Sequence, residues 1–262
     1  MSATNRDEFR DCGATVIRKF WDQEEVEQIK QAIQDVSKSP GPMIDVFEYD
    51  AAGTPLFFND FNNWRRLQSL KNICLNPKIA NAFKSLTGAS EAFFFHDHVI
   101  CKKAGATKPT PWHLDKSYFM LDGNYTASFW TPTSSLSADQ SLAFARGSHK
   151  RRALLMSKGF DDGASLEDSS ELEDFTYQDV ESTYERISWD VELGDVVVFD
   201  FYTIHCAPSA HITSDRQALS LRVVGEGTTF DARIKSPAPP FTRMGYRAQH
   251  GDPINENWFP KY

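Results

Sequence analysis

The sequence predicts a mainly β fold in which helices pack on a β-sandwich or jelly roll. Helical patterns are confined to the first third of the chain. From residue 93 onward, short runs rich in aromatic and β-branched residues alternate with Gly, Pro, Asp and Ser. With 262 residues, 40% of them hydrophobic, the chain suits one large domain with a substantial core and is not globally disordered.

The N-terminal third is expected to carry the helices. A strand-like run at residues 14–17 precedes a capping box, Asp22-Gln-Glu-Glu25, which is followed by apolar residues at helical spacing. A strand, a turn and a strand are expected over residues 43–59, and a second helix over residues 76–86.

Six short strands are expected in the rest of the chain. They cover residues 93–102, 125–131, 141–145, 187–193, 195–199 and 218–224. We therefore expect a single domain, 1–262, with a helical flank at 1–90, a β core at 91–225 and a C-terminal extension at 226–262.

The formal net charge of −8 is concentrated in one segment. Residues 160–185 contain ten acidic residues and no Lys or Arg, which leaves a balance of +2 on the rest of the chain. We interpret this segment as an insertion between two strands near one mouth of the barrel. It is either a solvated loop or a lid that folds over the pocket when substrate binds.

The sequence also favours a cytoplasmic protein that binds neither nucleic acid nor membrane. No window approaches the roughly 18 apolar residues that span a bilayer. Asp7, Glu8 and Asp11 lie where a signal peptide would be basic and then apolar. No basic patch is visible. The cysteines are far apart and form no CxxC pair, which indicates reduced thiols; they are Cys12, Cys74, Cys101 and Cys206.

Residues 107–118 contain the first candidate metal ligands. In an extended segment, residues two apart project to the same side, so His113 and Asp115 would present an imidazole and a carboxylate to one point. His205 follows a buried strand and is a candidate third ligand. Two histidines and one carboxylate form the facial triad of non-haem Fe(II) oxygenases, which leaves three coordination positions open.

A 2-oxo acid cosubstrate needs a cation for its acid end, and Arg binds a carboxylate through a bidentate fork. Arg216 lies eleven positions after His205 and can turn back beside the metal. Arg222 competes for this role, but it lies within an alternating strand and is equally suited to face substrate or to pair structurally.

Several motifs in the same order are similar to the phytanoyl-CoA dioxygenase family of Fe(II)/2-oxoglutarate-dependent oxygenases. They are Pro111-Trp-His-Leu-Asp115, Trp130, the run at residues 142–150, Leu193-Gly-Asp195, His205, and Arg216 through Arg222. The resemblance covers roughly residues 93–224. It implies a double-stranded β-helix, which is a cupin-like jelly roll.

The resemblance also implies the roles of individual residues. His113, Asp115 and His205 would ligate iron, and Arg216 would form a salt bridge with the distal carboxylate of 2-oxoglutarate. Trp130 would line the cosubstrate pocket.

The chain departs from the family pattern at Ala207. Many family members carry a hydroxyl residue at this position, two residues after the distal histidine, where it assists the arginine. The candidates to replace it are Thr110, Thr203 and Ser220, and the sequence does not choose among them.

Other residues of the predicted strand at 93–102 are weaker candidates for the pocket. His98 is expected either to line it or to be a hydrogen-bonded core histidine, with His96 on the same face of the strand. Lys102 or Lys103 is a candidate to balance charge near the cosubstrate, although exposed lysines are the rule.

These residues favour a dioxygenase that uses Fe(II), 2-oxoglutarate and O2 to hydroxylate a C–H bond of a small-molecule metabolite, releasing succinate and CO2. The carboxylate of Asp115 leaves no ligand position for a halide, which argues against a halogenase. Two alternatives remain: a non-catalytic cupin-like sensor or binding protein, and a metal-dependent hydrolase or isomerase with the same ligands. The substrate cannot be read from the sequence, and the chain is expected to be a monomer or homodimer.

Overall fold

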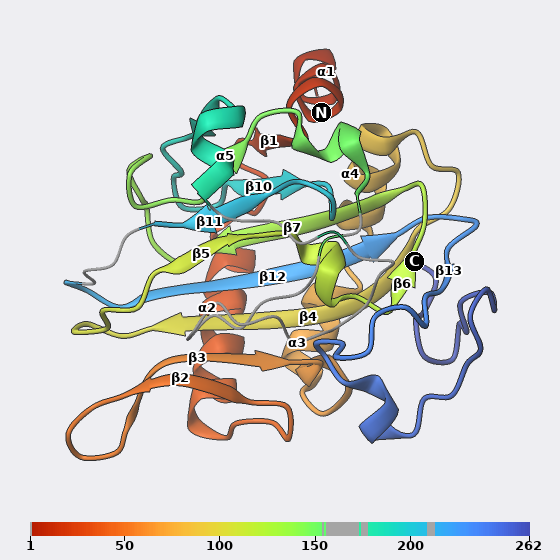
Figure 1. The fold of residues 1–262 in the computed structure, drawn as a ribbon. Coiled ribbons are helices and arrows are strands. Elements are labelled where there is room, and N and C mark those ends of the chain that lie inside the picture. The colour runs from red at the N-terminus through yellow and green to blue at the C-terminus, as the bar shows by residue number, and fades with distance from the viewer. Residues whose placement is uncertain (1, 154, 156–172, 174–177, 209–212) are drawn as a thin grey trace.

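The computed structural model describes residues 2–153, 155, 173, 178–208 and 213–262. Within them, two antiparallel sheets face each other in a jelly roll (Figure 1). The large sheet has seven strands in the order β1 (Ala14–Ile17), β10 (Val196–Phe199), β7 (Thr126–Pro132), β12 (Arg216–Val224), β4 (Phe93–Lys102), β3 (Pro55–Phe61) and β2 (Asp45–Tyr49). The small sheet has four, in the order β5 (Thr110–His113), β11 (His205–Ala207), β8 (Ala143–Ala145) and β9 (Arg186–Ser188).

The remaining elements cover the sheets. The α-helices are α1 (Ala3–Cys12), α2 (Gln23–Lys38), α3 (Gln68–Cys74), α4 (Pro77–Thr87) and α5 (Gln178–Thr183). The 3-10 helices are η1 (Asn63–Arg65), η2 (Asp115–Tyr118), η3 (Ser148–Arg151) and η4 (Phe241–Met244), and a two-stranded ribbon joins β6 (Leu121–Asp122) to β13 (Thr229–Phe230). None of the helices described is long and apolar enough to cross a membrane.

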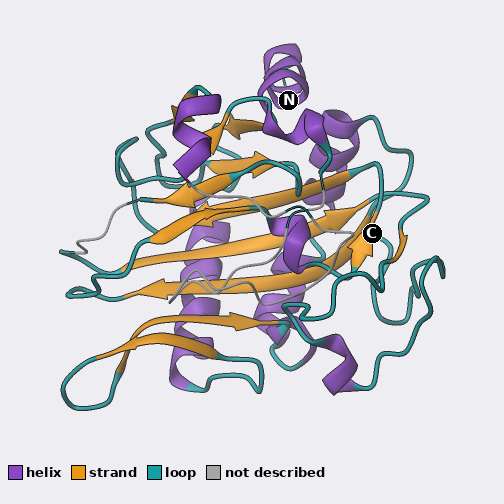
Figure 2. Cartoon of the chain, viewed as in Figure 1, coloured by secondary structure: helices purple, strands orange, loops and turns teal. Residues whose placement is uncertain are grey.

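Helices α2, α3 and α4 pack on the outer face of the large sheet (Figure 2). The capping box predicted for α2 is present, with Glu25 N donating to Asp22 Oδ1 and Asp22 N donating to Glu25 Oε2, both at 2.9 Å. The apolar side of α2, including Ile29 and Ile33, joins the same buried cluster as Leu219 and Leu221 of β12. Burial of this shared apolar surface holds the helices on the sheet.

Successive side chains of β12 point alternately to this outer core and to a cavity between the sheets. Leu219, Leu221 and Val223 lie in the cluster beneath the helices. The even-numbered residues from Arg216 to Arg222 line the cavity. A strand with one apolar and one polar face thus positions basic side chains inside the jelly roll.

The three strands expected within the N-terminal flank are present, and β1, β2 and β3 form the two edges of the large sheet. The strand expected at 187–193 needs one correction. It is shorter, because β9 ends at Ser188 and only an isolated bridge, Leu136 to Val191, continues the pairing.

Most of the acidic segment at 160–185 lies outside the described residues, so the lid interpretation does too. Glu173 and residues 178–185 are described. Glu185 forms an exposed ion pair with Arg146 at 2.9 Å.

Candidate metal centre and cavity

The two sheets bring together the three residues predicted to be metal ligands. His113 at the end of β5 and His205 at the start of β11 are direct partners in the antiparallel ladder. Asp115 begins η2, just after β5. Its Oδ1 lies 3.9 Å from Nε2 of both histidines. One donor atom from each residue lies within 4.8 Å of the other two, which is close enough for one ion to contact all three.

Hydrogen bonds fix which nitrogen of each imidazole carries the proton. Nδ1 of His113 contacts the carbonyl of Pro111, and Nδ1 of His205 contacts the carbonyl of Thr203, both at 2.9 Å. A carbonyl only accepts, so both Nδ1 atoms must donate, which leaves the lone pairs on the Nε2 atoms that face Asp115. Burial lowers the pKa of both histidines, to about 3 for His205, so both rings are neutral near pH 7, as metal ligation requires.

The two oxygens of Asp115 have different surroundings. Oδ2 accepts a hydrogen bond from Ser128 Oγ at 2.8 Å and lies 3.2 Å from Arg222 Nε. Oδ1 faces the histidines. Burial alone would raise the pKa of Asp115, but the charge of Arg222, the two histidines and the Ser128 hydrogen bond hold it well below its usual range. The carboxylate is therefore ionised and oriented for a cation.

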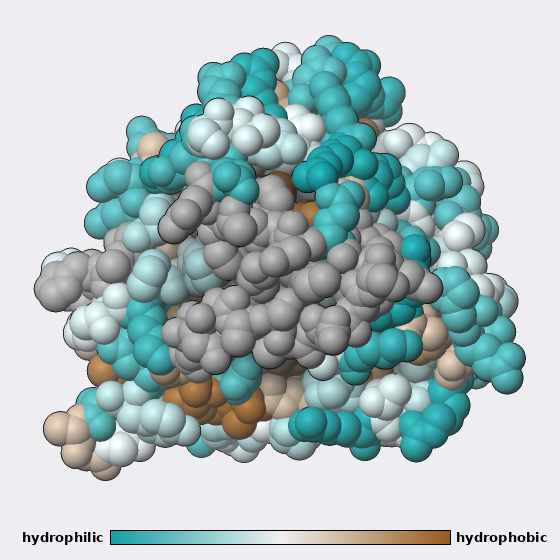
Figure 3. Space-filling model, viewed as in Figure 1, coloured by the Kyte–Doolittle hydropathy of each residue, from teal (hydrophilic) through white to brown (hydrophobic). Residues whose placement is uncertain are grey.

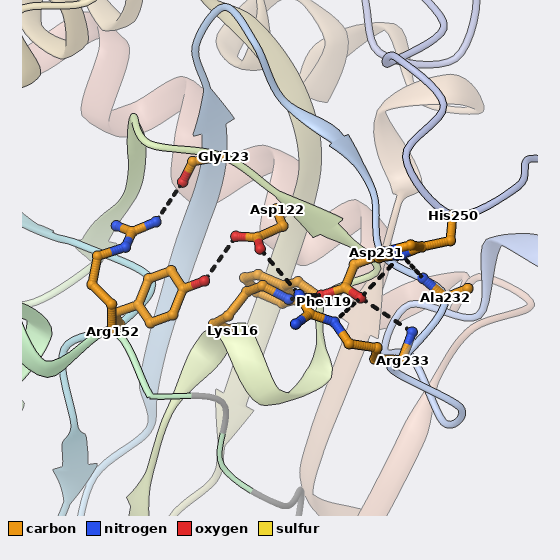
Figure 4. Close-up of polar contacts among 10 residues, drawn as sticks. Lys116, Phe119, Asp122, Gly123, Arg152, Asp231, Ala232, Arg233 and His250 are labelled. Carbon is orange, nitrogen blue, oxygen red and sulfur yellow. Dashed lines mark hydrogen bonds and ion pairs between the residues drawn. The ribbon is translucent and has the colours of Figure 1, made fainter. Parts of the chain in front are cut away.

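The residue after Asp115 points the other way, into a polar cluster formed with the C-terminal extension (Figure 4). Lys116 Nζ donates to Asp231 Oδ2 at 2.8 Å and to the Phe119 carbonyl at 3.3 Å. The side chains of Lys116 and Asp231 are 0% and 1% exposed, and Arg233 donates to the same carboxylate at 2.8 Å. This buried pair ties the turn that carries Asp115 to residues 226–262.

The triad opens into a cavity of about 320 Å³ whose floor is the inner face of the large sheet. The strand register arranges this floor in rows. The row nearest the metal ligands holds Arg222, opposite Ser128. The second row holds Trp130, Ser220, His98 and Phe61, the third holds Ala218, Ile100 and Asn59, and the last holds Arg216, Lys102 and Phe57.

All four residues predicted to bind the cosubstrate line this cavity together with the triad: Arg216, Trp130, His98 and Thr110. Arg216 is half-buried, and its Nη1 donates to the Gln140 carbonyl at 2.5 Å. His98 stacks on Phe61, with ring centroids 4.3 Å apart. His96 is fully buried and is not part of the cavity lining.

The structure distinguishes the three candidates for the missing hydroxyl. Thr203 donates to the Gly13 carbonyl at 2.8 Å and is not part of the lining. Ser220 lines the cavity, but its hydroxyl accepts a hydrogen bond from Arg222. Thr110 lies directly opposite Ala207 in the ladder between β5 and β11 and also lines the cavity. Thr110 is therefore the best placed of the three.

Sequence reasoning missed the wall that β2 and β3 contribute. Phe57, Asn59 and Phe61 alternate along β3 and all line the cavity, as does Phe47 on β2. Figure 3 shows hydrophobic surface over these two strands. The alternation was visible in the sequence, but nothing in it showed which face would meet the metal site.

Comparison with known proteins gives a family and a fold. The model of the family described as phytanoyl-CoA dioxygenase (PhyH) matches residues 9–218. No curated protein sequence matches the chain.

Solved structures with the same fold include the non-heme alpha-ketoglutarate-dependent carbocyclase SnoK from nogalamycin biosynthesis. It is 20% identical, with a TM-score of 0.78, over 100% of this chain and 96% of that one. The epimerase SnoN in complex with Fe3+, alpha-ketoglutarate and nogalamycin RO is 16% identical, with a TM-score of 0.74, over 98% and 97%. EvdO2 from Micromonospora carbonacea var. aurantiaca, complexed with 2-oxoglutarate, is 18% identical, with a TM-score of 0.64, over 98% and 96%.

Proposed function

This chain belongs to the phytanoyl-CoA dioxygenase (PhyH) family of Fe/2-oxoglutarate-dependent enzymes, and from that premise we propose that it is a dioxygenase that hydroxylates a C–H bond of a small molecule. The observation that carries the proposal is the buried cluster of His113, Asp115 and His205, with both Nε2 atoms and one carboxylate oxygen directed at one point. Neutral imidazoles and an ionised carboxylate are the donor set that suits Fe(II).

The cavity also fits the cosubstrate. Arg216 lies in the row farthest from the triad, at the opposite end of the lining. In our proposal it binds the distal carboxylate of 2-oxoglutarate, whose 2-oxo acid end reaches the metal. Trp130 forms the wall between these two ends, and His98 and Thr110 complete the lining.

Bound iron, with 2-oxoglutarate and O2, supplies the oxidising power through decarboxylation of the cosubstrate to succinate and CO2. The protein supplies orientation and a dry site. The two histidines donate hydrogen bonds to the Pro111 and Thr203 carbonyls, and Asp115 accepts one from Ser128; these bonds hold the three ligands in place. Apolar side chains on the lining, including Phe119 and Phe199, exclude water around the reacting atoms.

The cavity volume suits a small molecule. Phe47 and Phe61 form an aromatic wall of the lining apart from the metal ligands and from Arg216, and we assign the substrate to this wall. The substrate would then rest on aromatic surface with its reactive carbon toward His113 and Asp115.

Succinate release from 2-oxoglutarate, measured with added Fe(II) in air across classes of metabolites, tests the proposal. We expect release in the native protein and its loss in His113→Ala, Asp115→Ala and His205→Ala. His250→Ala serves as a control because that side chain is 60% exposed and lies outside the cavity lining. No succinate with any substrate would favour the binding-protein or hydrolase alternatives.

The similarity to SnoK and SnoN favours a second class of outcome, since SnoK is a carbocyclase and SnoN is an epimerase. Mass spectrometry of the product separates the three reactions. Hydroxylation adds one oxygen atom, ring closure removes two hydrogen atoms, and epimerisation leaves the mass unchanged.

A further inference from the structure

We propose that Lys102 is a second cation for the cosubstrate, and that Lys102 and Arg216 together clamp the distal carboxylate of 2-oxoglutarate. This inference rests on the proposed function, because it takes 2-oxoglutarate to be the ligand. It assigns a role in cosubstrate binding to Lys102, a residue that takes no part in metal ligation.

The burial of Lys102 is the first observation. Its side chain lies in the cavity lining, and the residue is only 2% exposed. Nζ donates to the Lys108 carbonyl at 3.0 Å and lies 4.3 Å from the centre of the Phe57 ring. Among the described residues, no carboxylate forms an ion pair with Lys102. Burying an ammonium group beside a carbonyl and an aromatic ring costs desolvation free energy that only a bound anion would offset.

The second observation is the position of Arg216. It is the direct partner of Lys102 across β12 and β4, which lie side by side in the large sheet (Figure 1). Side chains in such a pair have Cβ atoms roughly 5 Å apart, and like charges there destabilise the sheet. Arg216 donates to the Gln140 carbonyl and has no carboxylate partner within the described part of the chain. An anion shared between the two cations would remove this repulsion.

Two carboxylates line the cavity within the described residues, Asp45 and Asp115, and neither forms an ion pair with Lys102 or Arg216 there. Asp115 faces Arg222 at 3.2 Å and the two histidine ligands, so its charge is already compensated. Asp45 lies on β2, opposite Asn59 and outside the row of Lys102 and Arg216. Ala207 offers no hydroxyl to assist Arg216. Lys102 approaches from the neighbouring strand and provides the additional donor.

The electrostatics of the site predict how the clamp responds to pH. Burial, and then the charge of Arg216 on β12, lower the pKa of Lys102 to about 7, while Glu48 on β2 acts in the opposite direction. Lys108, in the loop before β5, is also charged and presents its carbonyl to Nζ of Lys102. Only the protonated amine binds a carboxylate, so affinity for 2-oxoglutarate should fall as the pH rises through the pKa of Lys102.

Calorimetric titration of the Mn(II)-loaded protein with 2-oxoglutarate tests the inference without turnover. We expect Lys102→Met to weaken binding roughly tenfold to a hundredfold, because a charge-assisted hydrogen bond is lost. Lys102→Arg should restore most of the affinity. Lys103→Met is the matched control: it removes the same charge one position along the chain, outside the lining, and should bind normally.

Two further measurements separate a clamp from a structural role. The affinity of the native protein for 2-oxoglutarate should be lower at about pH 9 than at about pH 6, because the pKa of Lys102, about 7, lies between these values. The affinity of Lys102→Arg should be the same at both pH values. Without ligand, Lys102→Met should melt at or above the temperature of the native protein, because an uncompensated buried charge has been removed.

If the native protein binds 2-oxoglutarate and Lys102→Met binds it with the same affinity, this inference is wrong and the proposed function stands. A raised KM of Lys102→Met for the organic substrate would then assign Lys102 to an anionic group of the substrate. Absence of 2-oxoglutarate binding in the native protein would overturn the proposed function and the clamp together.

Discussion

Arg216 and Arg222 lie six residues apart on the same face of β12, yet the structure predicts opposite consequences for their loss. Arg222 Nε lies 3.2 Å from Asp115 Oδ2, and the two side chains are 4% and 7% exposed. Removing one partner of a buried ion pair costs about 3 to 5 kcal/mol, because the other charge stays buried without compensation. For a chain of this size, that corresponds to a fall of about 6 to 20 °C in Tm.

The perturbation is Arg222→Met, and the assay is a thermal melt with and without Mn(II). A bound divalent cation places positive charge beside Asp115 and partly replaces the guanidinium. We therefore expect the loss of Tm to be large in the metal-free variant and smaller in the metal-loaded one.

Arg216→Met is the control on the same strand face. Arg216 is half-buried and pairs with no described carboxylate, so its loss should change the metal-free Tm little. It should instead weaken 2-oxoglutarate binding by on the order of 2 to 5 kcal/mol, which is tens-fold to thousands-fold in Kd. The reasoning is refuted if metal-free Arg222→Met has the same Tm as the metal-free native protein. It is also refuted if Arg222→Met weakens 2-oxoglutarate binding more than Arg216→Met does.

Three further results are expected from the residues around Asp115. Ser128→Ala should lower Mn(II) affinity about tenfold to a hundredfold in a metal titration, because Asp115 Oδ2 loses its hydroxyl donor. Unchanged affinity would show that Arg222 alone orients the carboxylate. Lys116→Met should lower the free energy of unfolding by about 3 kcal/mol in urea, since Asp231 loses its buried partner and keeps only the partly exposed Arg233 and the exposed His250 among the described residues. A change below about 0.5 kcal/mol would contradict the importance of this pair. Burial would raise the pKa of Asp231, but Arg233 and Lys116 hold it below its usual range, so its contribution is complete above about pH 4 and is lost as the pH falls further. The stability gap between the native protein and Lys116→Met should therefore narrow in acid.

Much of the architecture could be predicted because its signals are local. The capping box at Asp22 fixed the start of α2, and the aromatic and β-branched run from Phe93 to Lys102 coincides with β4. Helix α1 was missed because it buries only Phe9 and Cys12, too few apolar residues for a helical period. Strands β5 and β11 were missed because four and three residues carry no usable alternation, and it is pairing between distant segments that makes them strands.

The same difference between local sequence signals and pairing of distant segments applies to the site. The triad could be predicted because His113 and Asp115 are close in sequence and His205 follows a recognisable strand. The pairing of Arg216 with Lys102, and the contact of Arg222 with Asp115, depend on the register between strands and on side-chain direction. No local pattern encodes either.

Anaerobic titration of the metal-free protein with Fe(II) and 2-oxoglutarate tests most directly the claim that His113, Asp115 and His205 hold one iron ion that binds the cosubstrate. We predict a visible absorption band that needs both additions, saturates at one Fe(II) and one 2-oxoglutarate per chain, and is lost in Asp115→Ala and His205→Ala. The claim is contradicted if either variant gives the same band with the same stoichiometry, or if the native protein binds Fe(II) and its spectrum does not respond to 2-oxoglutarate.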